Sequence, residues 1–302
     1  MALKQIKNKI ISTQKTGKVT KAMEAVSAVK MRKSQERALA GKAYAEAAVR
    51  ILHRISQSQD SAHFFAGGSN SGKECLIVIT SDKGLAGSLN SAVLKEASRL
   101  LEGKSKDDVR IIAFGKKAYE FFGRGGYTIE QNYINVSDEV SLGDMGEVIE
   151  HITTHFTSGK YRKVSVIYQS FVSTFEQKAV VRQVLPLDAG ELEGMVRDIV
   201  PKKGLHSEEV VSGGQHHVYT VEPDVEEVAS KLIPQLVQIM LYHALLENKA
   251  SEHSARMVAM KNATDKAKEI TKMLTIKFNK ARQAEITAEV SEITGGIEAM
   301  KT

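Results

Sequence analysis

The sequence predicts an α+β fold, in which a long antiparallel coiled coil of the N- and C-terminal helices joins a central, Rossmann-like α/β domain. Three observations predict it. The first proline is Pro186, so long helices are permitted before it. Helix-forming patterns occupy both ends of the chain, and between them apolar β-branched runs alternate with amphipathic segments. We expect an N-terminal shaft helix at 1–56, the α/β domain at 74–222 and a C-terminal shaft helix at 224–296.

The first helical pattern runs from Leu3 to about Ile55, which corresponds to roughly 80 Å of α-helix. Apolar residues recur along it at helical spacing, but the middle of the stripe consists of Ala, Ser and Gly. Small side chains let a partner helix approach closely, although they bury less apolar area than leucine does. The helix should therefore need a constant neighbour.

The middle of the chain alternates strand and helix patterns, which predicts a parallel sheet. We expect the segment 56–73 to be a connector and leave the polar insertion 188–215 unassigned. The last two strands should lie at an edge. The predicted strands are 75–80, 109–114, 164–171, 178–185 and 217–221, and the predicted helices are 90–101, 116–122 and 143–156.

The second long helix follows Pro223, where Asp224 and Glu227 form a capping box, and continues to Gly295 and Gly296. At roughly 105 Å it is longer than the first by about 18 residues. If both helices leave the same domain, they run antiparallel and the second overhangs as a lone helix. The overhang has an apolar face, so we expect another protein to surround it. This face contains Ile286, Val290, Ile293 and Ile297.

Composition excludes several classes of protein. The 302 residues include 42 basic and 36 acidic side chains, a net charge of +6, and 42% are hydrophobic, so a globular chain is favoured over disorder. The only cysteine, Cys75, excludes an intramolecular disulfide and cysteine-rich metal sites. The most apolar stretch, Leu232 to Leu246, is shorter than the roughly 20 residues that cross a bilayer. We expect no membrane span, and no secretory signal at the amino terminus.

Positive charge is concentrated near the N-terminus, where ten Lys or Arg residues in the first 37 face only Glu24 and Glu36. Such a helix could follow nucleic-acid phosphates, bind an acidic protein surface, or present a solvated face. No aromatic residue that could stack on bases precedes Tyr44, which weakens the nucleic-acid interpretation.

No catalytic, cofactor or metal site is predicted. The loop 81–90, SDKGLAGSLN, follows a strand as a ligand loop would, but lacks phosphate-loop and dinucleotide spacing, so its glycines more plausibly serve a tight turn. His151 and His155 have the i, i+4 spacing of a metal pair without the Glu of the HExxH motif. We interpret them, and the pair His216 and His217, as surface histidines.

Four stretches of the sequence resemble the gamma subunit of F-type ATP synthases, the central rotor shaft. They are IKNKIIS with TGKVTKAMEAV (6–12 and 16–26), the 81–90 loop, ALLENKASEHSARMVAMKNATDKA (244–267) and NKARQAEITAEVSEITGG (279–296). The family commonly has Cys at Ala86 and Ala at Ile297. The insertion lacks the paired cysteines of the redox-regulated chloroplast type, and no transit peptide precedes the first helix, which favours a bacterial protein.

The resemblance implies a non-catalytic rotor subunit of a proton-translocating ATP synthase. The shaft would turn inside a ring of three alpha and three beta subunits, and its base would rest on the c-subunit ring beside the epsilon subunit. It would thereby couple ion flow to ATP synthesis or hydrolysis, at the cytoplasmic face of the bacterial inner membrane and peripheral to it. The alternative is a coiled-coil structural or hinge protein with a nucleotide-binding α/β domain.

The resemblance also implies partner contacts. Lys18, Lys21 and Met23 would lie near mobile acidic segments of beta, although Met23 fits ordinary seam packing nearly as well. Tyr219 and Glu222 would face the c ring and epsilon. Contacts with the alpha/beta ring would also come from the C-terminal motif, namely Arg256, Arg282, Gln283, Thr287, Glu289 and Glu292, of which Glu292 has simple solvation as its alternative.

Overall fold

The computed structural model describes residues 3–40, 47, 71–187 and 225–300. It divides into two compact units, Met1–Ser27 with Met257–Thr302, and Ala28–Arg256. Helices α1 (Leu3–Ala40) and α8 (Val225–Ala299) each contribute residues to both units, which are described separately below. The domain limits expected from the sequence remain predictions.

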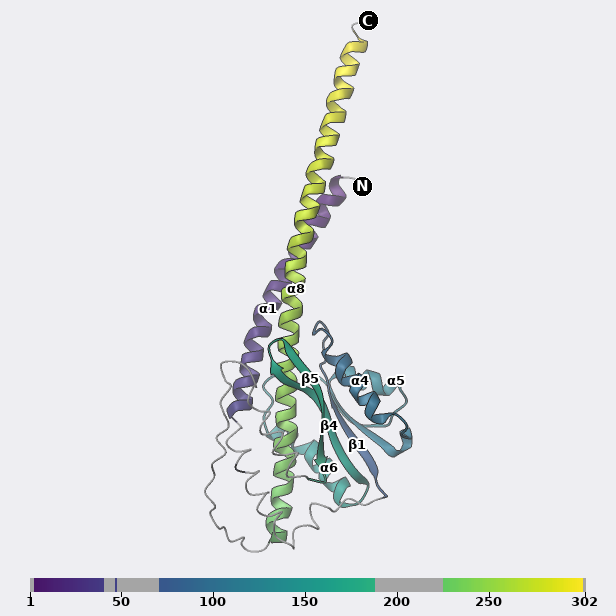
Figure 1. Ribbon diagram of the computed structural model, residues 1–302, viewed down its shortest axis with the longest axis vertical. Helices are drawn as coiled ribbons and strands as arrows, with labels where there is room; N and C mark the ends of the chain where they lie inside the picture. The colour runs from purple at the N-terminus through teal and green to yellow at the C-terminus, as the bar shows by residue number, and fades with distance from the viewer. Residues whose placement is uncertain (1–2, 41–46, 48–70, 188–224, 301–302) are drawn as a thin grey trace. The chain divides into compact units, whose positions relative to one another are not determined.

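The first unit is an antiparallel pair of helices formed by the start of α1 and the end of α8 (Figure 1). The hydroxyls of Thr20 and Thr264 are 2.7 Å apart. A Cβ atom built on Gly17 would lie 3.4 Å from the Cβ of Ala267. Gly17 is three residues before Thr20, whereas Ala267 is three residues after Thr264, so the two helices run in opposite directions. The predicted antiparallel coiled coil is confirmed.

The second unit is built on a five-stranded sheet in the order β3-β2-β1-β4-β5. The first four strands of that order are mutually parallel, and β5 pairs with β4 in the antiparallel sense. In the centre, Ile77 of β1 lies between Ile112 of β2 and Val166 of β4. The strands are β1 Lys73–Ile79, β2 Val109–Phe114, β3 Ile129–Tyr133, β4 Tyr161–Ser173 and β5 Glu176–Leu185.

Helices cover both faces of this sheet. Helices α4 (Leu89–Leu101) and α5 (Lys116–Arg124) pack on one face, where Leu76 and Val78 of β1 are buried. Helix α6 (Gly146–Thr157), the N-terminal part of α8 and Ala38 of α1 pack on the other. Both sets of alternate side chains on β1 are therefore buried, which explains its continuous apolar sequence. Two 3₁₀ turns, Lys106–Asp108 and Gly143–Met145, precede β2 and α6.

The predicted strands at 75–80, 109–114, 164–171 and 178–185 match β1, β2, β4 and β5, and the predicted helices match α4, α5 and α6. Strand β3 was not predicted, because its sequence IEQNY is polar and its side chains are only partly covered at the edge of the sheet. The predicted strand at 217–221 and the insertion 188–215 lie outside the described residues, as does most of the connector.

The C-terminal helix differs from its predicted end, whereas the predicted end of the N-terminal helix lies outside the described residues. Helix α1 is described to Ala40, and its expected continuation to Ile55 lies outside the described residues except for Ala47, which is helical. Helix α8 passes through Gly295 and Gly296 and ends three residues later, at Ala299. Glycine in a helix interior costs only about 1 kcal/mol relative to alanine, so these two residues weaken the helix without ending it. Asp224 of the expected capping box is also outside the described residues.

A tight turn joins β2 to α5. Gly115 has φ +88°, and a Cβ atom there would lie 2.3 Å from the carbonyl oxygen of Thr80. The Thr80 hydroxyl donates to the carbonyl of Phe114 and accepts from the amide of Ala118. Only glycine fits this position, and the close approach fixes the start of α5 against the end of β1.

Within the described residues, no helix combines the length and the apolar character that a bilayer crossing requires.

Candidate functional site

The paired helices of the first unit pack through small side chains. Thr20 and Ser27 of α1, and Thr264 and Ala267 of α8, are buried along the seam. Either threonine hydroxyl can donate to the other, and the remaining proton is accepted by a carbonyl of its own helix, that of Gly17 or of Met260. The seam is thus narrow and partly polar, and it buries less apolar area than a leucine seam would.

Gly17→Ala is expected to raise the free energy of unfolding by up to about 1 kcal/mol, because alanine is the better helix former and the added Cβ only touches that of Ala267. Gly17→Leu should instead lower it by about 1–3 kcal/mol, because a larger side chain forces the helices apart. Urea unfolding followed by circular dichroism measures both changes.

Gly295 provides the matched control, since it lies inside α8 with no atom within 4 Å of a built Cβ. Gly295→Ala and Gly295→Leu should both be neutral or slightly stabilising. If leucine has the same effect at 17 and at 295, the close seam is not what constrains Gly17.

A basic groove of about 820 Å³ lies beside this seam. Lys18 and Lys21 of α1 line it together with Lys268 and Lys272 of α8. Lys21 forms an ion pair with Glu24 at 3.3 Å, and Lys268 forms one with Asp265 at 3.2 Å. Both of these lysines are largely exposed, so the pairs are weak and the groove keeps its positive potential.

The fold thus brings the predicted contacts Lys18 and Lys21 together with two lysines that were not predicted from the sequence. Lys268 and Lys272 are four residues apart and therefore share one face of α8. This spacing, next to the small residue Ala267, is the sequence feature from which the two lysines could have been predicted to line the groove. Met23 is half-buried, between the buried seam positions Thr20 and Ser27, so part of its side chain packs and part stays accessible.

The end of α8 from residue 282 to 297 is an exposed helix within the first unit. Along it, at 100° per residue, Ile286, Val290, Ile293 and Ile297 form one stripe and Ile293 is 64% exposed. Glutamates flank the stripe on one side, and small residues occupy the opposite face. All five of the predicted contacts in this segment are exposed, namely Arg282, Gln283, Thr287, Glu289 and Glu292.

Arg256 differs from the other predicted contacts because it is buried in the second unit. Its guanidinium donates to Glu252 at 2.7 Å and to the carbonyl oxygen of Gly84 at 3.3 Å. It therefore holds the 81–90 loop against α8. Its contact with a surrounding ring remains a prediction, and Tyr219 and Glu222 lie outside the described residues, as do His216 and His217.

Asp82 of the 81–90 loop forms its hydrogen bonds with other parts of the same chain. The carboxylate of Asp82 accepts hydrogen bonds from the amides of Lys116 and Asn135, at 2.9 and 3.0 Å. Asp82 thus occupies the N-terminus of α5, the place where a helix would receive a phosphate. Gly87 has φ +58°, which agrees with the expected role of the glycines in a tight turn.

A charged cluster lies beside this loop, in a cavity of about 290 Å³. The carboxylate of Asp138 is 2.7 Å from Lys30, 3.4 Å from Lys249 and 3.0 Å from the Nε2 of His253. The hydrogen bond from His253 is the largest influence on Asp138; it opposes the effect of burial and, with the two lysines, holds the pKa of this carboxyl far below its usual range. The cluster connects the segment after β3 to α1 and α8.

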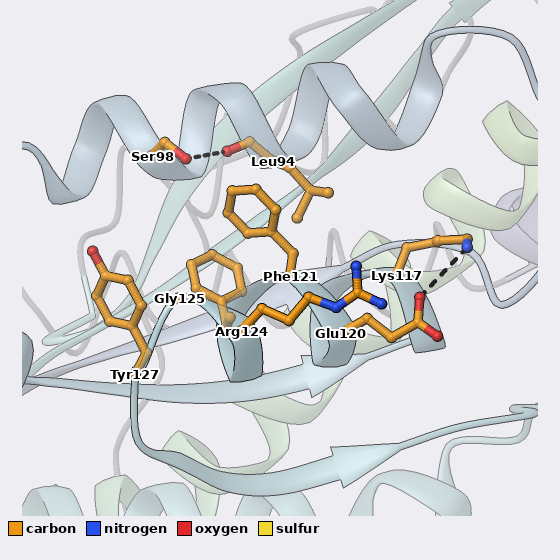
Figure 2. A pocket seen from close by; sticks show the side chains of 9 residues that line it. Leu94, Ser98, Lys117, Glu120, Phe121, Arg124, Gly125 and Tyr127 are labelled. Carbon is orange, nitrogen blue, oxygen red and sulfur yellow. Dashed lines mark hydrogen bonds and ion pairs between the residues drawn. The ribbon is translucent and has the colours of Figure 1, made fainter.

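A hollow of about 510 Å³ lies between α4 and α5 (Figure 2). Leu94 and Phe121 give it an apolar floor, and Lys117, Glu120 and Arg124 surround it. Lys117 and Glu120 pair at 3.5 Å. Lys117 and Glu120 therefore neutralise each other, and Arg124 is the one remaining charged residue among the described residues that line the hollow.

Comparisons with known proteins agree with this geometry. The family pattern described as "ATP-synt: ATP synthase" matches residues 2–300. The ATP synthase gamma chain of Pelotomaculum thermopropionicum is 36% identical over 301 residues, which cover 99% of each chain. The chain belongs to the ATP synthase gamma chains. The gamma chain of Roseiflexus sp. (strain RS-1) is 38% identical over 305 residues and 98% of each chain.

A solved structure shows that this fold recurs at a wide sequence distance. A chain of the Euglena gracilis mitochondrial ATP synthase, described as OSCP/F1/c-ring in rotational state 3, superposes with a TM-score of 0.66 at 19% identity, covering 99% of this chain and 94% of that one. The resemblance to the gamma family and the predicted fold class are both confirmed.

Proposed function

We propose that this chain is the rotor shaft of an ATP synthase, and that its paired helices turn inside a ring of alpha and beta subunits. The observation that carries the proposal is the exposed end of α8, whose apolar stripe has no covering partner among the described residues of the first unit. Membership in the gamma chains supports the same role. A protein that surrounds this segment would bury the stripe.

The unequal faces of the segment provide a physical basis for coupling. One face presents isoleucine and valine, one flank presents glutamates, and the opposite face presents small side chains. Each orientation of the shaft then makes different contacts with the subunits around it. A ring can respond to rotation only through such differences in contact free energy between its open and closed states.

The predicted contacts fit this role chemically. The basic groove that contains Lys18 and Lys21 suits an acidic segment of beta. Arg282 offers planar, bidentate hydrogen bonds to a carboxylate, so its contact can form and break at defined angles. The further contacts we assign to the ring are Met23, Arg256, Gln283, Thr287, Glu289 and Glu292. Tyr219 and Glu222 are proposed to face the c ring and the epsilon subunit.

We place the complex at the cytoplasmic face of a bacterial inner membrane, with this chain peripheral to it and protons as the coupling ion. The chain itself is proposed to make no covalent bond in the reaction. The alternative, a hinge protein with a nucleotide-binding domain, gains nothing from the 81–90 loop, where Asp82 occupies the helix N-terminus that a phosphate would need.

The mass of the intact complex tests the proposal. Purification of the tagged full-length chain under gentle detergent should yield one copy with three copies each of two larger nucleotide-binding subunits. The purified chain alone should show no ATPase activity and no thermal stabilisation by magnesium-ATP. A free monomer or homodimer, or steady ATP turnover by the isolated chain, would contradict the assignment.

A shortened chain tests the role of the exposed segment. A chain that ends at Ala281 should bind the alpha/beta ring at least tenfold more weakly in a titration of ring against labelled chain, on the order of 1.4 kcal/mol or more. A chain that ends at Ala299 is the control and should bind like the full-length protein. Equal affinity of all three chains would show that the segment is not enclosed by the ring.

A further inference from the structure

The second unit contains a cluster of side chains of the kinds that bind metal ions, contributed by β3, α6 and β4. One ligand atom each from Glu130, His151 and His155 lies within 4.8 Å of the others. The Nε2 of His151 is 3.0 Å from the Oε2 of Glu130 and 3.1 Å from the hydroxyl of Tyr161, which also donates to Glu130. The two histidines, interpreted from the sequence as surface residues, are half-buried and hydrogen-bonded.

The spacing of the histidines places both rings on one side of α6. Their centroids are 4.1 Å apart in a stacked arrangement, as expected for positions i and i+4. The Nδ1 of His155 lies 2.8 Å from the carbonyl oxygen of His151. A carbonyl oxygen only accepts, so Nδ1 carries the proton and Nε2 of the neutral ring keeps its lone pair. A backbone hydrogen bond of this kind orients histidine ligands in metal sites.

The carboxylate of Glu130 is positioned and ionised in a way that suits a bound cation. Arg110 pairs with Oε1 of Glu130 at 3.2 Å, which leaves Oε2 directed at His151. Burial raises the pKa of Glu130, but hydrogen bonds from Tyr161 and His151 outweigh it and hold the pKa below its usual value. The side chains of Glu130 and His151 are 23% and 19% exposed, so an ion from solvent can reach them.

We propose that Glu130, His151 and His155 bind a divalent transition-metal ion, with zinc as the best match, and that a water molecule completes the site. Two imidazoles and one carboxylate form a ligand set that zinc accepts in tetrahedral geometry. Ligand atoms in such a site lie about 3.3–3.5 Å apart, as follows from metal–ligand distances of about 2.0–2.2 Å. Binding through Nε2 of His151 requires the neutral ring to carry its single proton on Nδ1.

The donor set also defines what should not bind. Magnesium and calcium prefer oxygen ligands, and this site offers mainly imidazole nitrogen, so an excess of either ion should not displace zinc. Cys75 is buried near Tyr161, and burial raises the pKa of its thiol. It therefore stays protonated and is not included among the ligands.

Equilibrium dialysis of the purified, chelator-treated full-length chain against zinc, in excess magnesium, tests the proposal. The natural chain should retain one zinc ion per molecule, and zinc should raise its thermal midpoint. His155→Gln and His151→Gln should each weaken zinc binding at least tenfold, since even a lost outer partner of a metal ligand costs about 10–100-fold. Glutamine at 151 can still hydrogen-bond to Glu130 and Tyr161, so that variant is expected to fold.

The sequence offers a matched control, because His216 and His217 could also capture zinc. The His216→Gln/His217→Gln double variant should bind zinc like the natural chain. Circular dichroism without metal confirms that each variant is folded before comparison. The proposal is overturned if the natural chain retains no zinc, or if the double variant loses zinc that both His151→Gln and His155→Gln retain.

Discussion

Asp138→Ala is expected to lower the free energy of unfolding by about 3–5 kcal/mol, the cost of breaking a largely buried pair by removing one partner. The Asp138 carboxylate balances Lys30, Lys249 and His253. The side chain of Lys249 is 11% exposed and that of His253 is 5% exposed, so water solvates these two groups poorly once the carboxylate is removed. Urea unfolding at neutral pH, followed by circular dichroism because the chain has no tryptophan, measures the change.

The adjacent Glu139 is the matched control. It pairs with Arg37 at 3.3 Å, but its side chain is 71% exposed, so Glu139→Ala should change the free energy of unfolding by less than about 1 kcal/mol. Asp138→Asn keeps an acceptor without the charge and should fall between the two. If Asp138→Ala costs no more than Glu139→Ala, the cluster does not hold α1 and α8 against the segment after β3.

The same carboxylate sets a pH limit. Because the pKa of Asp138 is depressed in the folded chain, its stabilising contribution is present above the ordinary value of 3.8 and is lost as pH falls below it. This acid loss should be absent in Asp138→Asn. This loss occurs at lower pH than the loss expected for the buried His243, whose pKa is lowered from 6.5 to about 4.

Much of the fold could be predicted because its signals are local. The apolar run of β1 and the helical periodicity of α1 and α8 follow from which side chains are buried. Strand β3 escaped prediction because its place at the sheet edge, fixed by pairing with β2, leaves it polar. Gly295 and Gly296 suggested a helix end, but intrahelical hydrogen bonds persist through glycine at modest cost.

The functional surfaces were less accessible to sequence reasoning. Lys18 and Lys21 were predicted from the resemblance, but their groove also needs Lys268 and Lys272, which become neighbours only when the helices pair. The Glu130 cluster joins residues from β3 and α6, whose proximity depends on the order of the strands. The contact of Arg256 with a partner stays a prediction, but its bonds to Glu252 and to the Gly84 carbonyl depend on the fold and were not predicted.

His243 is the second determinant of stability with a large expected effect. It lies in α8 within the core of the second unit, and its Nδ1 has no hydrogen-bond partner among the described residues. Burial disfavours the charged ring and lowers its pKa from 6.5 to about 4. Between these values the unfolded chain binds a proton that the folded chain does not, so stability falls as pH falls from 6.5 to 4 and changes no further below that.

The free energy of unfolding should therefore decrease by about 3 kcal/mol between pH 7.5 and pH 4, at about 1.4 kcal/mol for each unit of pKa shift. His243→Leu has no titrating ring and should flatten this part of the profile, whatever its effect at pH 7.5. Urea unfolding at closely spaced pH values measures each profile, and a slope that survives in His243→Leu would assign the acid sensitivity to another group.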